Sequence, residues 1–209
     1  MNRRFYLALR DLHLYLGLFF APFVAAFSVS VFFLVHAWLP GADAEADAPR
    51  VVAGLTMPAG VETLPARERV EALQRMLAEA GIGGEIGFVR YDVKAGRLAM
   101  PVIMPGREKE VEIDLASGNA MVRERETGVW DALVFLHKAP GPHLVDIRKN
   151  WWPMQAWHWL ADGTAYLVCF ISLSGIYLWV ALKAERRVGL ALLGAGAATF
   201  AGVVYAVVH

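Results

Sequence analysis

The sequence predicts a membrane α-helical protein with three transmembrane helices and a small α+β extracytoplasmic domain between the first two. Hydrophobic residues make up 57% and charged residues only 19% of the 209-residue chain, which is too apolar for an ordinary soluble domain of this size. One apolar run near the N-terminus and two near the C-terminus are long enough to cross ~30 Å of hydrocarbon. The residues between the first two runs show a helix pattern followed by strand patterns.

The first predicted spanning helix covers residues 12–39 and follows a cytoplasmic N-terminus of residues 1–11. A cleaved signal peptide is the alternative, because Arg3 and Arg4 precede the run and Ala42-Asp43-Ala44 resembles a cleavage site. The apolar core is longer than an ordinary signal-peptide core. We therefore expect an uncleaved signal anchor.

The second and third predicted spanning helices cover residues 156–182 and 188–209, joined by a cytoplasmic loop of residues 183–187. Basic residues flank the first run and fill this loop, and the positive-inside rule places such clusters in the cytoplasm. The N-terminus is then cytoplasmic, and both the inserted domain and the C-terminus are extracytoplasmic.

The predicted extracytoplasmic domain covers residues 40–127, and an interfacial segment of residues 128–155 follows it. Apolar residues recur at helical spacing from Pro65 to Ala80, with Gly81 suited to the C-terminal cap. Three strand-like runs come next, separated by turns at Lys94-Ala95-Gly96 and Pro105-Gly106; they are Ile86–Val93, Leu98–Met104 and Glu108–Leu115. We expect one helix packed on an antiparallel sheet.

Composition and motifs exclude several functions. Lys plus Arg and Asp plus Glu both total 20, so no net basic charge favours nucleic acid. Cys169 is the single cysteine, which excludes a disulfide framework, a CxxC redox pair and a cysteine zinc site. No nucleotide-binding, zinc-protease or serine-hydrolase motif is present. We interpret Ser172 and Ser174 as bonding backbone carbonyls or neighbouring helices, and the run Arg123–Glu126 as a solvated face.

Several segments resemble the PepSY-associated transmembrane family. Arg10-Asp-Leu-His13-Leu-Tyr-Leu-Gly17 is similar to its first helix, and Glu110–Gly118 is similar to the strand and turn of a PepSY domain. Leu136–His143 and Ser174-Gly175-Ile-Tyr-Leu-Trp179 resemble later signatures of the family. The resemblance implies a bacterial inner-membrane protein. Larger relatives include ferric-siderophore reductases that carry b-type haem on helix histidines, but this chain has fewer helices and no flavin or nicotinamide domain.

The histidines are the candidate haem ligands. An electron-transfer b cytochrome uses two axial imidazoles on one iron. His13 and His36 are separated by 23 residues, or ~34 Å of helix, so they cannot serve the same haem. Our candidate cofactor-binding residues are His13, His36, His137, His143 and His158. The first three are the preferred iron ligands.

On the predicted topology His13 alone lies near the cytoplasm, so an inner-face haem needs a second copy, another subunit or a non-histidine ligand. Outer-face pairs combine His36 with His137, His143 or His158. Each histidine also has a structural interpretation: a helix-end residue reaching the headgroups, an interfacial residue in the tryptophan belt, or part of an apolar docking face.

Three functions remain open from the sequence. The first is a b-type haem protein that transfers electrons across the membrane toward ferric chelates. The second is a non-catalytic anchor whose PepSY-like domain binds or restrains an extracytoplasmic partner such as a protease. The third is an accessory subunit of a larger complex. Gly194, Ala198 and Gly202 form a small-residue stripe on the third spanning helix, which favours helix packing, either within the chain or in a homodimer.

Overall fold

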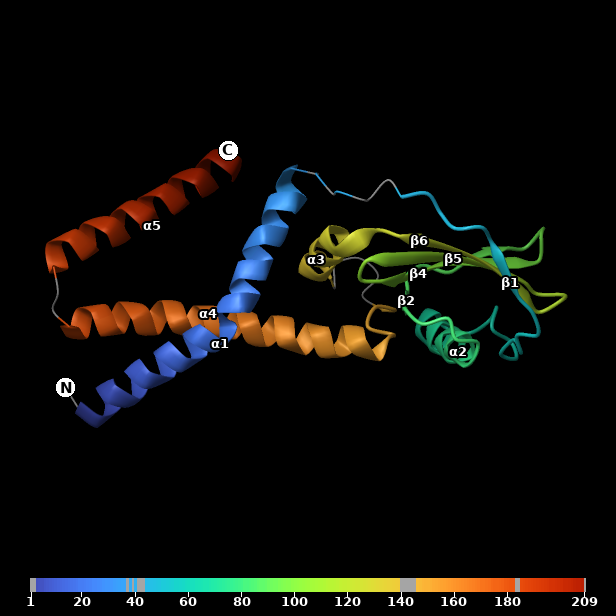
Figure 1. The fold of residues 1–209 in the computed structure, drawn as a ribbon, viewed down its shortest axis with the longest axis horizontal. Helices are drawn as coiled ribbons and strands as arrows, with labels where there is room; N and C mark the ends of the chain where they lie inside the picture. The colour runs from blue at the N-terminus through green and yellow to red at the C-terminus, as the bar shows by residue number, and fades with distance from the viewer. Residues whose placement is uncertain are drawn as a thin grey trace. The chain divides into compact units, whose positions relative to one another are not determined.

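The computed structural model describes residues 3–36, 38, 40, 44–139, 146–182 and 185–208. The described chain contains five helices and one antiparallel sheet (Figure 1). The helices are α1 Arg3–His36, α2 Ala66–Glu79, α3 Gly128–Lys138, α4 Trp152–Leu182 and α5 Arg186–Val208. The strands are β1 Arg50–Val52, β2 Glu85–Ile86, β3 Arg90–Asp92, β4 Arg97–Met104, β5 Arg107–Asp114 and β6 Asn119–Glu126.

The chain divides into two compact units, and the divisions fall inside α1 and α4. The first unit contains residues 1–21 and 165–209, and the second contains residues 22–164. Pro22, the first residue of the second unit, lies inside α1. A proline there removes one backbone hydrogen bond of the helix.

Three helices are long and apolar enough to cross a membrane, as the sequence predicts. They are α1, α4 and α5, with mean hydropathies of 2.4, 2.0 and 1.9 over their most apolar stretches. All three begin before the predicted apolar runs, because polar residues outside the hydrocarbon can continue a helix. The described side chains of α5 are exposed, apart from the partly covered Gly189. These features are those of a membrane protein.

The sheet has the order β1-β6-β5-β4-β2, and β3 also pairs with β4. The long hairpin of β4 and β5 turns at residues 105–106 and pairs Met100 with Val111 and Leu98 with Ile113. Residues on alternate positions of these strands are buried, as expected for a sheet with one covered face. The prediction of an antiparallel sheet in this segment is confirmed.

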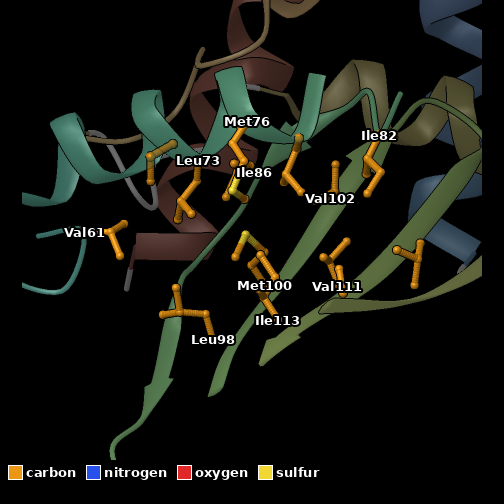
Figure 2. Packing of buried hydrophobic residues seen from close by; sticks show 14 of the residues in the cluster. Val61, Leu73, Met76, Ile82, Ile86, Leu98, Met100, Val102, Val111 and Ile113 are labelled. Carbon is orange, nitrogen blue, oxygen red and sulfur yellow. The ribbon is translucent and has the colours of Figure 1, made fainter. Parts of the chain in front are cut away.

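The core of the second unit lies between α2 and this covered face. Figure 2 shows Leu73 and Met76 of α2 directed toward Met100 and Val102 of β4. Leu73 and Leu77 are fully buried, as are Val102 and Ile113. Burial of a leucine or isoleucine side chain contributes about 1.5–3 kcal/mol. The α2 stripe read from the sequence is thus the face that holds the helix on the sheet.

The strand predictions were incomplete at both edges. The predicted strand Ile86–Val93 is split into β2 and β3 at residues 87–89, where the Gly87 N–H still donates to the Pro101 carbonyl. Strand β6 was not predicted, because its second half carries alternating charges. Ala120 and Val122 of β6 are buried, while Arg123 and Glu126 face solvent. The second half of β6 is a strand because it pairs with β5, not because it is hydrophobic.

A turn just before α4 is bound to the sheet domain. Ile147 is buried in the domain core, and the Arg67 guanidinium donates to the carbonyls of Asp146 and Arg148 at 3.5 and 3.4 Å. The side chain of Asn150 bonds the backbone of Ile86. The start of α4 is therefore fixed to the α2–sheet domain within the second unit.

Candidate functional site

His13 lies in the first unit and contacts α4. Its Nδ1 atom is 2.8 Å from the hydroxyl of Ser174, whose Oγ also lies 3.1 Å from the Ile171 carbonyl. A Cβ built on Gly175 would stand 3.5 Å from Cε1 of His13, so the ring lies in van der Waals range of α4 at this position. No partner of the His13 Nε2 atom is found among the described residues.

The surface next to His13 is open. A hollow of about 470 Å³ is lined by residues of α1 alone, namely His13, Leu14, Tyr15, Gly17 and Leu18. Nothing lies within 4 Å of the position that a Cβ of Gly17 would take. Glycine leaves the backbone accessible to a flat ligand. Among the described residues of the first unit, His13 is the only imidazole.

His137 lies in the second unit at the end of α3 and is packed against α1. Its Nδ1 atom is 3.0 Å from Oγ of Ser30, which lies 2.7 Å from the Phe27 carbonyl. The Phe27 ring meets His137 edge-on at 5.3 Å between centroids and stacks on Trp157. Trp157 in turn donates its Nε1–H to the Leu136 carbonyl at 3.0 Å. A small crevice of about 30 Å³ lies beside Ser30 and Trp157.

His36 is exposed at the end of α1, where its Nδ1 atom donates to the Phe32 carbonyl at 2.9 Å. It lies six residues beyond Ser30, the contact of His137. That spacing places it about 9 Å further along the helix and about 120° around it. The described geometry does not bring His36 and His137 to a common slot.

His158 forms a different kind of pair. Its Nε2 atom is 3.3 Å from a carboxylate oxygen of Asp162, one turn later on α4. The contact thus involves Nε2, whereas the hydrogen-bond contacts of His13, His36 and His137 described above involve Nδ1. Sequence reasoning missed Asp162, although an acidic residue inside an apolar run is itself a signal of a functional pair. Candidate His143 lies outside the described residues.

The prediction that Ser174 bonds a backbone carbonyl and a neighbouring helix is confirmed, and Ser172 bonds only the Val168 carbonyl of its own helix. Sequence reasoning missed Ser30, which has the same two contacts as Ser174. The available signal was a hydroxyl side chain inside an apolar run. Both hydroxyls are buried, with 1% exposure for Ser30 and 4% for Ser174.

The uncovered face of the sheet carries a second hollow, of about 570 Å³. Charged side chains from neighbouring strands line it, including Glu108 and Arg125, whose ion pair measures 2.7 Å. Phe88 adds an exposed ring, with the Arg90 guanidinium 5.4 Å from its centroid. This face therefore combines apolar and charged groups.

Within the described ranges, no group of three or more His, Cys, Asp and Glu side chains is placed to hold a metal ion. Imidazoles that would act in pairs remain the candidate ligands. Comparisons with protein-family models, with curated proteins and with solved structures found no match. The site is therefore assessed on its own chemistry.

Proposed function

We propose that the chain is a PepSY-associated protein of the bacterial inner membrane that binds b-type haem through His13 and takes part in electron transfer. The observation that carries the proposal is the position of His13, bonded through Nδ1 to Ser174 with Nε2 unpartnered beside an open hollow. Histidines within spanning segments are functional by default, since polar groups are costly there. Imidazole nitrogen is a suitable ligand for haem iron.

The two serine-bonded histidines differ in their surroundings. The His13 ring borders an open hollow of about 470 Å³ on the surface of α1. The His137 ring packs edge-on against Phe27, and its Nδ1 atom contacts Ser30. We therefore place the haem at His13, give His137 a packing role, and keep exposed His36 as an outer-face candidate.

The chain's own residues would orient the ligand and leave room for it. Ser174 would fix one side of the His13 ring, the ring lies beside Gly175, and Gly17 leaves room for a planar group. Bound haem would accept and release single electrons, with a potential set by its ligands and by the low dielectric of its surroundings. Ferric chelates are the proposed final acceptors.

A second residue would be needed to hold haem iron at this site. A second copy of the chain or another membrane subunit would supply it, and the small-residue stripe Gly194, Ala198 and Gly202 on α5 suits close helix packing. Added side chains at Gly194 and Gly202 would meet no described atom within 4 Å. The mass of the purified complex and its haem-to-protein ratio distinguish a homodimer from a mixed assembly.

The test is an absorption spectrum of the detergent-purified protein, oxidised and reduced, with haem supplied during expression. We expect a Soret band that shifts on reduction and that is lost in His13→Ala. His158→Ala is the control, since the Nε2 atom of His158 already lies 3.3 Å from the Asp162 carboxylate. A chain with no Soret band, or one whose band survives His13→Ala, is not the proposed haem protein.

A second function is favoured by the open sheet face. The hollow lined by Phe88, Arg90, Glu108 and Arg125 suits an extracytoplasmic peptide or protein that presents both apolar and charged groups. In this alternative the chain is a membrane-anchored binding module, and His13→Ala has no effect. Loss of partner capture in Phe88→Ala, with a normal response in Trp159→Ala, would favour it.

The proposed orientation puts the N-terminus and the α4–α5 loop in the cytoplasm and the sheet domain outside. A cysteine introduced at Lys94, in an exposed turn, should react with a membrane-impermeant maleimide in intact cells. A cysteine at Glu185 should react only after the membrane is opened. The reverse pattern would invert the topology.

A further inference from the structure

The two buried serines make the same pair of contacts, one in each unit. Each hydroxyl lies within hydrogen-bond distance of the carbonyl three residues earlier on its own helix and of Nδ1 of a histidine on another helix. Ser174 contacts Ile171 and His13, and Ser30 contacts Phe27 and His137. The chain separations are 161 and 107 residues, so local sequence does not explain the arrangement.

A serine hydroxyl has one proton, and a carbonyl can only accept. When the hydroxyl donates to its carbonyl, it must accept from the histidine, so the proton of the neutral ring is on Nδ1. If the proton were on Nε2 instead, the hydroxyl would have to donate to Nδ1 and would lose its carbonyl bond. The first arrangement makes two hydrogen bonds and the second makes one.

We infer that Ser174 and Ser30 select the Nδ1–H tautomer of His13 and His137, and that Ser174 thereby leaves the Nε2 lone pair of His13 free to bind the proposed haem iron. One extra hydrogen bond, at about 1 kcal/mol, corresponds to a preference of about fivefold. Such partners also orient metal-bound histidines in other sites. The inference deepens the proposed function, on which its haem-binding part rests, while its tautomer part stands without haem.

At His36 a backbone carbonyl, and not a serine, places the proton on Nδ1. Its Nδ1 atom faces the Phe32 carbonyl directly, and an acceptor-only partner requires a proton on Nδ1. His158 is the contrast, because its Nε2 atom faces the Asp162 carboxylate. Among the described residues, no partner is found for Nε2 of His13, His36 or His137. The two of these histidines that reach another helix do so through a serine.

Nearby serines provide matched controls. Ser172 bonds only the Val168 carbonyl and Ser28 only the Val24 carbonyl, and both are exposed. Substitution of either serine by alanine removes a hydroxyl from the same helix without affecting a histidine. Ser174→Thr and Ser30→Thr keep the hydroxyl and serve as rescue variants.

The test is ¹⁵N NMR of the full-length, histidine-labelled protein in lipid nanodiscs, without haem. Ser174→Ala should move His13 toward the Nε2–H tautomer and leave His137 unchanged, and Ser30→Ala should do the reverse. Ser172→Ala and Ser28→Ala should change neither, and the threonine variants should restore the wild-type signals. Unchanged tautomers in both alanine variants overturn the inference.

Haem titration of the same samples tests the second step. Ser174→Ala should weaken haem binding by about 10- to 100-fold, the usual effect of losing a residue that orients a metal ligand, while Ser172→Ala should not. Equal affinities in the two variants overturn the role of Ser174 in binding. If the alanine variants show the expected tautomer shifts but the wild-type protein takes up no haem, the proposed function is overturned and the effect of the serines on the tautomers stands.

Discussion

Asn150 bonds the backbone of Ile86 through both ends of its side-chain amide. The Ile86 N–H donates to Oδ1 at 2.9 Å, and Nδ2 donates to the Ile86 carbonyl at 2.7 Å. Nδ2 also lies 2.9 Å from the Ile147 carbonyl. The side chain thus acts as a short strand partner for β2 and ties the turn before α4 to the sheet.

Asn150→Ala should release this turn from the domain. Three hydrogen bonds are lost and the Ile86 N–H and carbonyl are left unpaired, so we expect a loss of about 1–3 kcal/mol in local stability. Amide hydrogen exchange at Ile86 measures it. Asn119→Ala is the control, at an exposed position of the same unit. Equal exchange in the two variants would contradict the role of Asn150.

Glu85 should make the domain less stable as the pH rises. Burial raises the pKa of its carboxyl above 4.5, although the Lys149 N–H, which donates to it, opposes that effect. A group whose folded pKa is raised contributes stability below its unfolded pKa, and this is lost as the pH rises through the folded pKa. Glu85→Gln should remove this loss of domain stability above pH 4.5. Hydrogen exchange of the β4 amides as a function of pH measures it. A profile that is unchanged in the variant would rule Glu85 out as its source.

Asp114 should show the opposite pH dependence. Its carboxylate accepts the backbone N–H and hydroxyl of Ser117 at 2.8 and 2.9 Å, which lowers its pKa below 3.8. The resulting stability is present above the unfolded pKa and is lost as the pH falls through the folded one. Asp114→Asn should remove the acid-side change in exchange at Ser117. If the change persists in the variant, another group causes it.

Trp157→Phe should loosen the end of α3. The variant keeps an aromatic ring against Phe27 but loses the hydrogen bond to the Leu136 carbonyl. We expect a local loss of about 1 kcal/mol, visible as faster exchange in the last turn of α3. Trp159→Phe is the control, because Trp159 is 80% exposed. A larger effect at Trp159 would argue against the packing described.

Gly118→Ala should destabilise the β5–β6 turn more than Gly96→Ala destabilises the β3–β4 turn. Both glycines have left-handed backbones, with φ of 67° and 62°, so any side chain is strained by about 1–2 kcal/mol. A Cβ on Gly118 would also lie 2.8 Å from the Leu55 carbonyl oxygen, whereas one on Gly96 meets nothing within 4 Å. Thermal unfolding followed by circular dichroism compares them. Equal losses of stability in the two variants would mean that the Leu55 carbonyl moves away from the new Cβ without a cost in free energy.

Much of the fold follows from local patterns in the sequence. The three long apolar helices, the α2 stripe and the β4–β5 hairpin were predicted from residues close together in the chain, because helical and strand periodicity are local properties. The stripe of Val70, Leu73 and Leu77 became the buried face of α2. Strands β1 and β6 were not predicted, since β6 depends on its pairing with β5 and β1 in turn on its pairing with β6.

The sequence by itself determined that histidines occur in and beside apolar runs, and therefore which residues are candidate ligands. Only the tertiary structure decided which nitrogen of each ring is bonded, and that Ser174 and Ser30 are the partners across 161 and 107 residues. It also decided that His137 packs against Phe27 and that the surface beside His13 is open. The physical reason is that hydrogen-bond partners and cavities arise where distant segments pack, and no periodicity within one segment encodes them.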